Sequence, residues 1–314
     1  MSTSVLNCWF LTGPTASGKT RIGLELAGLL DAEIVSLDSM TVYRDMDIGT
    51  AKPTPDERRR VPHHLIDMVA PSDHFSLSQY VDAAHEKIDE VRSRGRAVLF
   101  VGGTPLYLKS LLRGIYEGPP PDWQFRRQVE DEVRQVGTEA LHQRLSQVDP
   151  LSAAKLHPGD LRRIIRALEV YKATGQPISH SQTQFDEGRP ADRCKVFVLD
   201  WPRDGLHRRI NQRVKRMFAA GLITEVKGLL DRYGRLSRTA GQAVGYGEVI
   251  RHLEDQLDLS DTISLVQTHT RQFAKRQETW FRGLSECRRL PQSNEIDPAD
   301  MARRIVSAGQ SNPK

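Results

Sequence analysis

The amino-acid sequence predicts an α/β fold: a parallel sheet flanked by helices, with a helical insertion domain. Three observations support this prediction. Continuous apolar runs at 9–12, 33–37, 97–101 and 196–200 end in glycine or polar residues, as strands buried on both faces of a parallel sheet do. Segments with helical spacing lie between these runs. Residues 122–193 contain several helix signals and no convincing strand, which indicates a helical insertion.

The first elements of the sheet can be justified in order. Residues 9–12 precede a glycine-rich turn, and residues 22–30 then show helical spacing, so we expect strand, loop and helix. Residues 77–93, between the second and third apolar runs, are a helix candidate. Ser76 or Ser78 stands at a capping position for this helix.

Three consecutive prolines at 119–121 mark the start of the insertion, because proline cannot continue a helix. They are followed by Asp122, a suitable cap for the charged helical stretch that comes next. After the strand at 196–200 the pattern is helical again from His207 onward. The clearest helical segments are 219–230, 245–253 and 262–281.

These signals divide the chain into four expected parts. Residues 1–118 are the first part of the core, and residues 119–195 are the helical insertion domain. Residues 196–292 complete the core and add basic helices, and residues 293–314 form a C-terminal tail that we expect to be frayed. A chain of 314 residues is long enough for one large core plus a second module.

The composition is that of an ordinary globular protein, with 38% hydrophobic and 27% charged residues. The apolar runs are far shorter than the roughly 20 residues that a membrane helix needs, and the N-terminus has no charged region or cleavage site. We therefore expect a cytoplasmic protein with no membrane partner. Cys8, Cys194 and Cys287 are widely separated and lack metal-ligand spacing, so they predict neither a disulfide framework nor a zinc site.

The formal net charge of +5 is modest, but the positive charge is concentrated in two segments. Residues 203–216 carry six Lys or Arg against one acid, and residues 271–289 carry six against two. Such segments suit a phosphate backbone as partner. The alternative interpretation is that each segment is the solvated face of a helix.

The most specific motif is a phosphate-binding loop. The string GPTASGKT fits G-x-x-x-x-G-K-[ST], directly after a predicted strand and at the start of a predicted helix. Its glycines let the backbone approach phosphate oxygens, Lys19 neutralises terminal phosphates, and the Thr20 hydroxyl can hold Mg²⁺. We therefore expect a P-loop NTPase-like sheet whose pyrophosphate-binding residues are Gly13, Pro14, Thr15, Ala16, Ser17, Gly18, Lys19 and Thr20.

The loop does not by itself define the reaction. An ATPase places a carboxylate at the end of a later core strand, but the run at 97–101 ends in two glycines and Thr104. The acid that ends an apolar run near the loop is Asp38. Asp38, Thr104 and the loop all follow strands, so they should face one crevice at the carboxyl ends of the sheet. The alternatives are a turn or cap for Asp38, and a helix cap before Pro105 for Thr104.

These residues resemble those of the tRNA dimethylallyltransferases, also called tRNA isopentenyltransferases. The resemblance covers roughly residues 8–285, and the family's strings occur in order. They are GPTASGKT, SLDSMTVYRDMDIGTAKP, VPHHLID, VGGTPLYLKSLL, HPGDLRRIIRALEV, QAVGYGE and TRQFAKRQETWFR. Gly247 departs from the pattern, because the family more often has Lys or Arg after Gly-Tyr.

The resemblance implies transfer of the dimethylallyl group of dimethylallyl diphosphate to N6 of the adenosine 3′-adjacent to the anticodon of tRNA, with release of pyrophosphate. It implies that Asp38 is the general base, that Thr104 bonds near the same amine, and that Lys19 and Mg²⁺ on Thr20 stabilise the leaving group. It also suggests a monomer. The residues that it places against tRNA are Asp38, Ser39, Met40, Thr41, Thr104, Arg126, Arg162, Arg163, Ile164, Ile165, Arg166, Gln242, Ala243, Val244, Gly245, Tyr246 and Gly247.

Two further sets of basic residues are candidate phosphate ligands. Arg213, in the first basic segment, is a candidate second clamp on pyrophosphate. Arg162 and Arg166 are four residues apart on one helix face, which suits a phosphate track, although a solvated face is the alternative. The opposite face of that helix carries its apolar residues.

Two other patterns favour structural roles. His63 and His64 are adjacent, so in a strand they would point to opposite faces, which disfavours a metal site. The stripe Trp280, Phe281 and Leu284 predicts core packing rather than a surface for stacking bases.

Three alternative functions are open on the residues alone. A small-molecule kinase would use the same loop and an acceptor-binding Asp, but it leaves the insertion and the basic segments without a role. A related transferase that acts on free adenine nucleotides shares the loop and Asp38, yet has less use for the insertion. A nucleotide-gated RNA-binding protein would bind tRNA without changing it.

Overall fold

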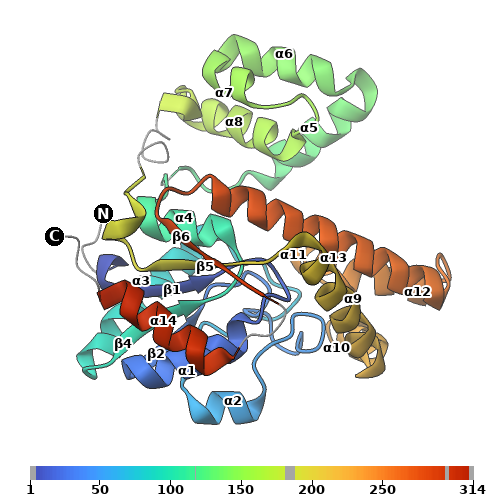
Figure 1. Ribbon diagram of the computed structural model, residues 1–314. Coiled ribbons are helices and arrows are strands. Elements are labelled where there is room, and N and C mark those ends of the chain that lie inside the picture. The colour runs from blue at the N-terminus through green and yellow to red at the C-terminus, as the bar shows by residue number, and fades with distance from the viewer. Residues whose placement is uncertain (1–4, 117, 181–187, 294–296, 311–314) are drawn as a thin grey trace. The chain divides into compact units, whose positions relative to one another are not determined.

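The structure is a computed structural model that describes residues 5–116, 118–180, 188–293 and 297–310. It divides into two compact units, residues 1–112 with 188–314 and residues 113–187, and each is described by itself (Figure 1). The second unit overlaps the expected insertion at 119–195 but begins and ends earlier. The expected segments 1–118, 119–195 and 293–314 are described only in part, because residues 1–4, 117, 181–187, 294–296 and 311–314 lie outside the described residues.

The first unit is built on a parallel sheet with the strand order β3-β2-β4-β1-β5-β6. The strands are β1 (Trp9–Thr12), β2 (Ala32–Ser36), β3 (His63–His64), β4 (Ala97–Val101), β5 (Val196–Asp200) and β6 (Cys287–Pro291). Phe10 of β1 pairs with Phe100 on one side and with Val196 on the other. The four predicted strands are confirmed, the second of them one residue earlier than expected. The phosphate loop therefore leaves the sheet from a strand that is paired on both sides.

The edge strand β6 was not predicted. Its sequence is short and carries Arg288 and Arg289, which pair in register with Phe197 and Val198 of β5. Charged side chains are common on edge strands, where they discourage pairing with another chain. The guanidinium of Arg288 lies over the Phe197 ring at 5.5 Å, so its charge also covers an apolar surface.

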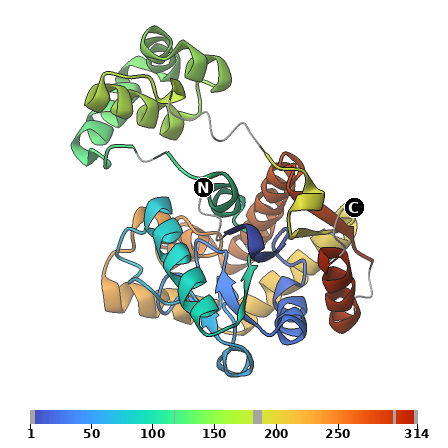
Figure 2. The same ribbon diagram turned by 90° about the vertical axis from the view of Figure 1, so that its left-hand side faces the viewer.

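Helices cover the sheet of the first unit. The ones that follow the strands are α1 (Lys19–Leu30), α2 (Pro55–Arg60), α3 (Leu77–Ser93), α4 (Pro105–Arg113), α9 (Arg203–Ala219), α10 (Leu222–Tyr233), α11 (Arg238–Gly241), α12 (Tyr246–Leu253), α13 (Leu259–Arg282) and α14 (Pro298–Gln310). In Figure 2, α1 and α14 lie on one side of the sheet and α3 on the other. Across the described residues, every helix is too short or too polar to cross a membrane.

Two helix boundaries show how local chemistry sets these elements. Ser76 caps α3 as expected: its hydroxyl accepts the backbone N–H of Gln79 at 3.2 Å, and the Gln79 amide oxygen accepts the Ser76 N–H. The prediction of a helix at 219–230 was wrong about where the helix begins. Ala219 ends α9, and Gly221, with φ of +100°, makes the turn into α10.

A large apolar cluster joins the sheet to α1 and α14. Strand residues of β1, β4 and β5 contribute Leu11, Leu99 and Phe197, all fully buried, and α1 contributes Ile22 and Leu26. Phe10 and Phe100 stack on each other, with ring centroids 4.8 Å apart. Burying these rings fixes the relative positions of the strands whose ends carry the candidate site.

The expectation of a frayed tail after Ser293 was wrong for residues 298–310. Residues 298–310 form α14, which packs along α1 and buries Met301, Ala302 and Ile305 in the same apolar cluster. Gly309 lies against Trp9, where an added Cβ would stand 2.2 Å from the indole ring. The apolar residues of this segment run from Met301 to Ala308, about two helical turns, so the sequence signal is short.

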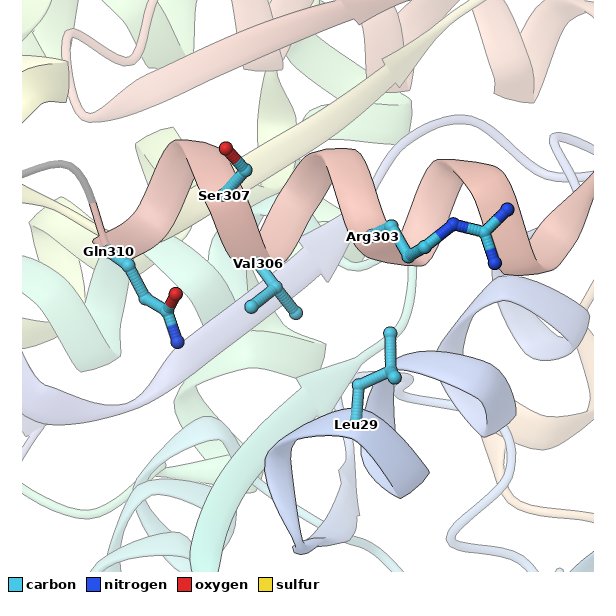
Figure 3. Close-up of a pocket in the computed structure, with 5 residues that line it drawn as sticks. All are labelled: Leu29, Arg303, Val306, Ser307 and Gln310. Atoms are coloured by element: carbon cyan, nitrogen blue, oxygen red, sulfur yellow. The ribbon is translucent and has the colours of Figure 1, made fainter.

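A shallow hollow of about 440 Å³ lies between α1 and α14. Figure 3 shows Leu29 of α1 and Val306 of α14 facing it, with Arg303 and Gln310 at its rim. The hollow is on the outer surface of these two helices, on the flank of the sheet and not at the carboxyl ends of its strands.

The second unit is a small helical bundle. It consists of α5 (Trp123–Val136), α6 (Thr138–Val148), α7 (Pro150–Lys155) and α8 (Leu161–Thr174), and no strand is described in it. Asp122 caps α5 as predicted by accepting the Phe125 N–H at 2.9 Å. Phe125, Leu145 and Ile164 belong to its own apolar core.

Candidate active site at the carboxyl ends of the strands

The phosphate loop has the predicted context of strand, loop and helix. β1 ends at Thr12, and α1 begins at Lys19. Gly13 has φ of +143° and Gly18 has φ of +95°, and both values favour glycine. A Cβ on Gly13 would stand 2.9 Å from the carbonyl oxygen of Leu199 in β5. Glycine is therefore needed here both for backbone conformation and for close approach to the neighbouring strand.

The Lys19 side chain lies within the loop. Its Nζ donates to the carbonyl oxygens of Gly13 at 3.0 Å and Pro14 at 2.7 Å. Burial and, to a smaller extent, the charge of nearby Arg213 lower the pKa of this amine to about 7, although Asp38 acts in the opposite direction. An anion held by this loop would favour the charged amine and raise its pKa again.

Asp38 follows β2 at the same end of the sheet. Its Oδ1 accepts the Met40 N–H at 2.8 Å, so Asp38 also stabilises a turn. A turn was the alternative interpretation of this residue in the sequence. The carboxyl group is enclosed by protein although the residue keeps some exposed surface. Burial raises the pKa of Asp38, while the Met40 N–H, Lys19 and Arg213 act in the opposite direction.

Thr104 is tied to the end of the neighbouring strand. Its N–H donates to the Leu37 carbonyl at 3.1 Å, and its Oγ1 accepts the Ser39 N–H at 3.0 Å. The side chain is thus engaged with the segment that carries Asp38, while its carbonyl accepts the Leu108 N–H at the start of α4. Gly102 permits this contact, since a Cβ there would stand 2.2 Å from the Leu37 carbonyl oxygen.

Arg213 joins the same group of charges from α9. Its pKa is lowered by its enclosed surroundings and raised by Asp38, and in turn it affects the pKa values of both Asp38 and Lys19. The structure therefore brings two cations from α1 and α9 together with one carboxylate from the end of β2. This places the expected second clamp beside the phosphate loop.

Three side chains that support the loop were not found in the sequence. Gln277 of α13 accepts the Thr15 N–H at 2.8 Å, and the Trp201 indole donates to the Ser17 carbonyl at 3.0 Å. Arg209 donates to the Ala16 carbonyl at 2.8 Å, and its guanidinium lies over Trp201. Gln277 lies inside one of the quoted strings and Trp201 directly follows a predicted strand, but neither signal indicates a contact with the loop.

The expected tRNA contacts in the first unit divide by exposure. Ser39, Met40 and Gln242 have exposed or partly exposed side chains, as do Ala243 and Val244, and Gly247 is partly exposed. Thr41, Gly245 and Tyr246 are buried instead. The Thr41 hydroxyl bonds to Ser36 at 2.8 Å, and the Tyr246 hydroxyl donates to Glu225 at 2.7 Å. The side chains of Thr41 and Tyr246 therefore stabilise the core and do not form an RNA-facing surface.

Glu225 organises two of these segments. Its carboxylate accepts the backbone N–H groups of Asp47, Ile48 and Gly49 at 2.6–3.2 Å in addition to the Tyr246 hydroxyl. Gly49 packs directly on the Tyr246 ring. The segment after Asp38 and the segment at 242–247 are thus held by one acid on α10.

The second unit presents a similar division among its expected tRNA contacts. Arg126 and Arg166 both bind the buried carboxylate of Glu169, at 2.7–2.8 Å and 2.5 Å. Burial alone would raise the pKa of Glu169, but these two arginines lower it overall. Ile164 and Ile165 are in the apolar core, as the helix pattern predicted, so their side chains do not face RNA.

Arg162 and Arg163 are exposed on α8, and Arg163 pairs with Asp160 at 3.0 Å. Arg162 is therefore the exposed cation of the expected phosphate track, whereas Arg166 is engaged with Glu169. The track that the spacing suggested has at least one arginine in a structural role.

The two basic segments contribute to one pocket of about 540 Å³. It adjoins the loop support Trp201 and is lined from α9, α13 and the ends of β5 and β6. The lining residues with charged or titratable side chains are Asp200, Arg203, His207, Arg271, Lys275, Glu278, Arg282 and Arg289. The pocket is electropositive because its cations outnumber its two acids.

The remaining structural interpretations have mixed outcomes. His64 bonds to Glu33 at 2.6 Å, and His63 bonds to the Val61 carbonyl. In the stripe on α13, Phe281 and Leu284 are buried as predicted. Trp280 is 36% exposed, so the assignment to the core was wrong for this residue.

Comparison with known proteins adds independent findings. The sequence model of the family described as IPP transferase matches residues 41–284. The chain is 52% identical to a tRNA dimethylallyltransferase of Rhodopirellula baltica over 288 residues, which cover 89% of this chain and 86% of that protein. It is 47% identical to the tRNA dimethylallyltransferase of Geobacter sulfurreducens, covering 87% of this chain and 88% of the relative.

Solved structures are similar over nearly the whole chain. One is the full-length tRNA isopentenylpyrophosphate transferase of Bacillus halodurans, with 38% identity, a TM-score of 0.70 and coverage of 98% of this chain and 97% of that one. Another is a eukaryotic dimethylallyltransferase acting on tRNA, with 26% identity, a TM-score of 0.74 and coverage of 96% and 76%.

Proposed function

The chain belongs to the tRNA dimethylallyltransferase (IPP transferase) family and is a transferase that prenylates tRNA, and we propose that its acceptor is N6 of the adenosine 3′-adjacent to the anticodon (position 37). The donor in this proposal is dimethylallyl diphosphate, and pyrophosphate is released. The observation that carries the proposal is the grouping of Lys19, Arg213 and Asp38 at one end of the sheet. Two cations suit a leaving diphosphate, and one carboxylate suits the proton of an attacking amine.

The first chemical requirement is stabilisation of the diphosphate as the allylic C–O bond breaks. The dimethylallyl cation is resonance-stabilised, so departure depends on neutralising the charge that accumulates on the leaving group. Lys19, Arg213 and the backbone N–H groups of the loop are the donors for this step. A larger fraction of Lys19 is protonated and positively charged when diphosphate binds, because the anion raises the pKa that burial had lowered.

Mg²⁺ is part of the proposal through Thr20. Its hydroxyl, on the second residue of α1, is partly exposed, and a hydroxyl oxygen is a suitable Mg²⁺ ligand. Among the described residues, no group of three acids, histidines or cysteines could hold a metal ion. The remaining ligands would be diphosphate oxygens and water, and the ion would add positive charge to the leaving group.

The second requirement is a base for the N6 proton. The adenine amine is a weak nucleophile because its lone pair is delocalised, and attack on the allylic carbon makes it more acidic. Asp38 accepts the proton as the new C–N bond forms, and its raised pKa makes it a better acceptor than an ordinary aspartate. Thr104 is bonded to Ser39 beside it, so its hydroxyl can orient the amine.

The acceptor base must leave its stack to reach this site. Extrusion costs a few kcal/mol and is cheapest in a loop, which is consistent with an anticodon loop as substrate. The exposed Gln242 and the partly exposed Ser39 and Met40 are the candidates for contacts with the flanking nucleotides in the first unit. We also propose that the protein is cytoplasmic and acts as a monomer; sedimentation of the free enzyme tests its oligomeric state.

The test is a mass measurement on the RNA. The protein is incubated with dimethylallyl diphosphate, Mg²⁺ and unmodified tRNA, and the digested nucleosides are weighed. A dimethylallyl adduct on the adenosine 3′ of the anticodon is the expected result. An adduct on free AMP but not on tRNA would support the adenine-nucleotide transferase instead. ATP turnover driven by a small alcohol would support the kinase, and RNA binding with no adduct would support a binding protein.

A further inference from the structure

One buried amide connects the two halves of the proposed reaction. Gln277 lies on α13 and is 3% exposed. Its Oε1 accepts the Thr15 N–H at 2.8 Å, and its Nε2 donates to the Gly103 carbonyl at 2.5 Å. The side chain therefore holds the phosphate loop with one atom and the end of β4 with the other.

The two partners belong to different substrate sites. Thr15 is in the loop that receives the diphosphate, together with Lys19. Gly103 directly precedes Thr104, whose hydroxyl is bonded to the Ser39 N–H next to Asp38. Two hydrogen bonds of Gln277, the peptide link from Gly103 to Thr104 and the bond between Thr104 and Ser39 thus connect the diphosphate loop to the residues that face the acceptor amine.

The local packing favours an uncharged amide at this point. A Cβ on Gly103 would stand 2.7 Å from the Gln277 Nε2, 3.2 Å from the Gly13 carbonyl oxygen and 3.5 Å from the Lys19 Nζ, so glycine is what lets these groups meet. Glutamate at 277 would keep an acceptor for Thr15 but lose the donor to Gly103. An aliphatic side chain would lose both bonds and leave the partly buried Thr15 N–H and the buried Gly103 carbonyl without this partner.

The other supports of the loop do not make this connection. Trp201 and Arg209 bind the carbonyls of Ser17 and Ala16, and both come from the β5 and α9 side. They stabilise the loop without contacting the end of β4 or the segment at Ser39. This contrast provides a control within the same site.

We propose that Gln277 is a positioning residue that couples the two substrates, so that diphosphate bound at the loop and RNA bound at Thr104 each strengthen the binding of the other. This rests on the proposed function. A ligand that orders one end of this connection also orders the other end, so the second ligand loses less conformational freedom when it binds. Coupling of this kind is reciprocal, because each ligand changes the affinity of the other by the same factor.

The test measures that factor directly. The affinity of the full-length protein for dimethylallyl S-thiolodiphosphate, an unreactive analogue of the donor, is measured by calorimetry with and without a saturating unmodified anticodon stem-loop RNA. We expect the wild-type affinity to rise with RNA by at least about fivefold, the lower end for coupled sites. In Q277L and Q277E the ratio should fall to about one, and Q277E should also bind the analogue more weakly in both conditions.

Two control variants separate coupling from general damage. Arg209→Gln should weaken binding of the analogue both with and without RNA. The ratio of the two affinities should stay at the wild-type value. Thr279→Val, on an exposed position of the same helix where the hydroxyl bonds to the Lys275 carbonyl at 3.0 Å, should change neither value. Thermal melting identifies a misfolded variant, and Q277E, which keeps one of the two bonds, then replaces Q277L as the deciding variant.

The outcomes distinguish the inference from the function on which it rests. A ratio near one in the wild type, or an unchanged ratio in a folded Gln277 variant, overturns the coupling even if the enzyme forms the dimethylallyl adduct. Absence of the adduct in the wild type overturns the proposed function, whatever the binding ratio is.

Discussion

The Lys19 amine and the Asp38 carboxyl follow different strands, yet each favours the charged form of the other. Asp38 acts to raise the pKa of Lys19, and Lys19 acts to lower the pKa of Asp38. This interaction places the proposed diphosphate-binding amine and the proposed base in one electrostatic environment. Arg213 adds a second positive charge to the same group. Protonation and substrate binding at these residues should therefore be linked.

Asp38→Asn should cripple transfer. Loss of a general base costs typically about 10² to 10⁴-fold in rate. Single-turnover measurements with saturating tRNA should show a fall in that range, with little change in RNA affinity. Asp45→Asn is the matched control, since Asp45 lies in the same segment but pairs with Arg232 and Tyr233. A variant at Asp38 that keeps the wild-type rate would remove this residue from the role of base.

Diphosphate binding should take up a proton at mildly alkaline pH. Burial lowers the pKa of Lys19 to about 7, so the free amine is largely neutral at pH 8, and a bound anion raises its pKa. Affinity should therefore fall as pH rises above 7, until the pH reaches the pKa of the bound form. Calorimetry in buffers of different ionisation enthalpy measures the uptake. Lys19→Ala should lose it, and equal uptake in both proteins would show that the proton goes to another group.

The same pKa shift makes stability rise with pH, whereas it makes the affinity for diphosphate fall. Lys19 is protonated up to its ordinary pKa in the unfolded chain but only to about 7 in the folded one. Between these values the unfolded state binds more protons, so the contribution of this group to the free energy of unfolding rises with pH.

Gly102→Ala should damage the acceptor side of the site more than the diphosphate side. Its Cβ would collide with the Leu37 carbonyl, which accepts the Thr104 N–H. Overpacking of this kind costs typically about 1–3 kcal/mol, measured by urea unfolding. The transfer rate should fall while the affinity for the diphosphate analogue changes less.

Gly28→Ala on α1 is the control for that substitution. Gly28 has open space around its Cβ position, so alanine should stabilise the helix by about 0.5–1 kcal/mol. If both alanine variants were equally stable and active, the close approach of Gly102 to the Leu37 carbonyl would not matter for function.

Glu169→Gln should destabilise the second unit. The side chain of Glu169 is almost fully buried between Arg126 and Arg166, and removal of its charge weakens both bonds at a cost of about 1–3 kcal/mol. The folded-state pKa of Glu169 is lowered, so this contribution is present above the ordinary pKa of glutamate and is lost as pH falls through the folded value. Unfolding curves of wild type and variant should therefore converge in acid. Glu132→Gln, which breaks an exposed pair with Arg144, should cost less than about 1 kcal/mol.

Arg162→Ala should weaken tRNA binding. Arg162 is exposed on α8, and removal of one phosphate contact should reduce the slope of log affinity against log salt by about one. Filter binding over a salt series measures this slope. Arg134→Ala is the control, because Arg134 is exposed in the same unit but pairs with Asp131. Identical slopes for both variants and the wild type would exclude a phosphate contact at Arg162.

Local sequence signals were sufficient for much of the site. The loop, Asp38 and Thr104 each follow an apolar run, and strands that end at one edge of a sheet must place them together. After burial, the largest effect on the pKa of Lys19 comes from the charge of Arg213. Arg213 was a candidate pyrophosphate ligand only because it lies in the first basic segment. These residues could be found because each signal lies within a few positions of the residue.

The parts that were missed depend on distant contacts. Gln277 is 262 positions from Thr15, so no local pattern links them. Thr41 and Tyr246 lie in strings expected to bind tRNA, but the hydrogen bonds to Ser36 and Glu225 turn their side chains inward. Strand β6 carries arginines because it is an edge, and α14 owes its burial to α1, which is distant in the sequence.

The packing of α14 on α1 has a consequence for synthesis of the protein. α1 begins with Lys19, and its apolar face forms one cluster with Met301 and Ile305. During translation, the helix that begins with Lys19 acquires its outer cover after residues 298–310 have left the ribosome. Until then Leu24 and Leu26 border an incompletely covered apolar surface, so the nascent chain is vulnerable to aggregation through this face.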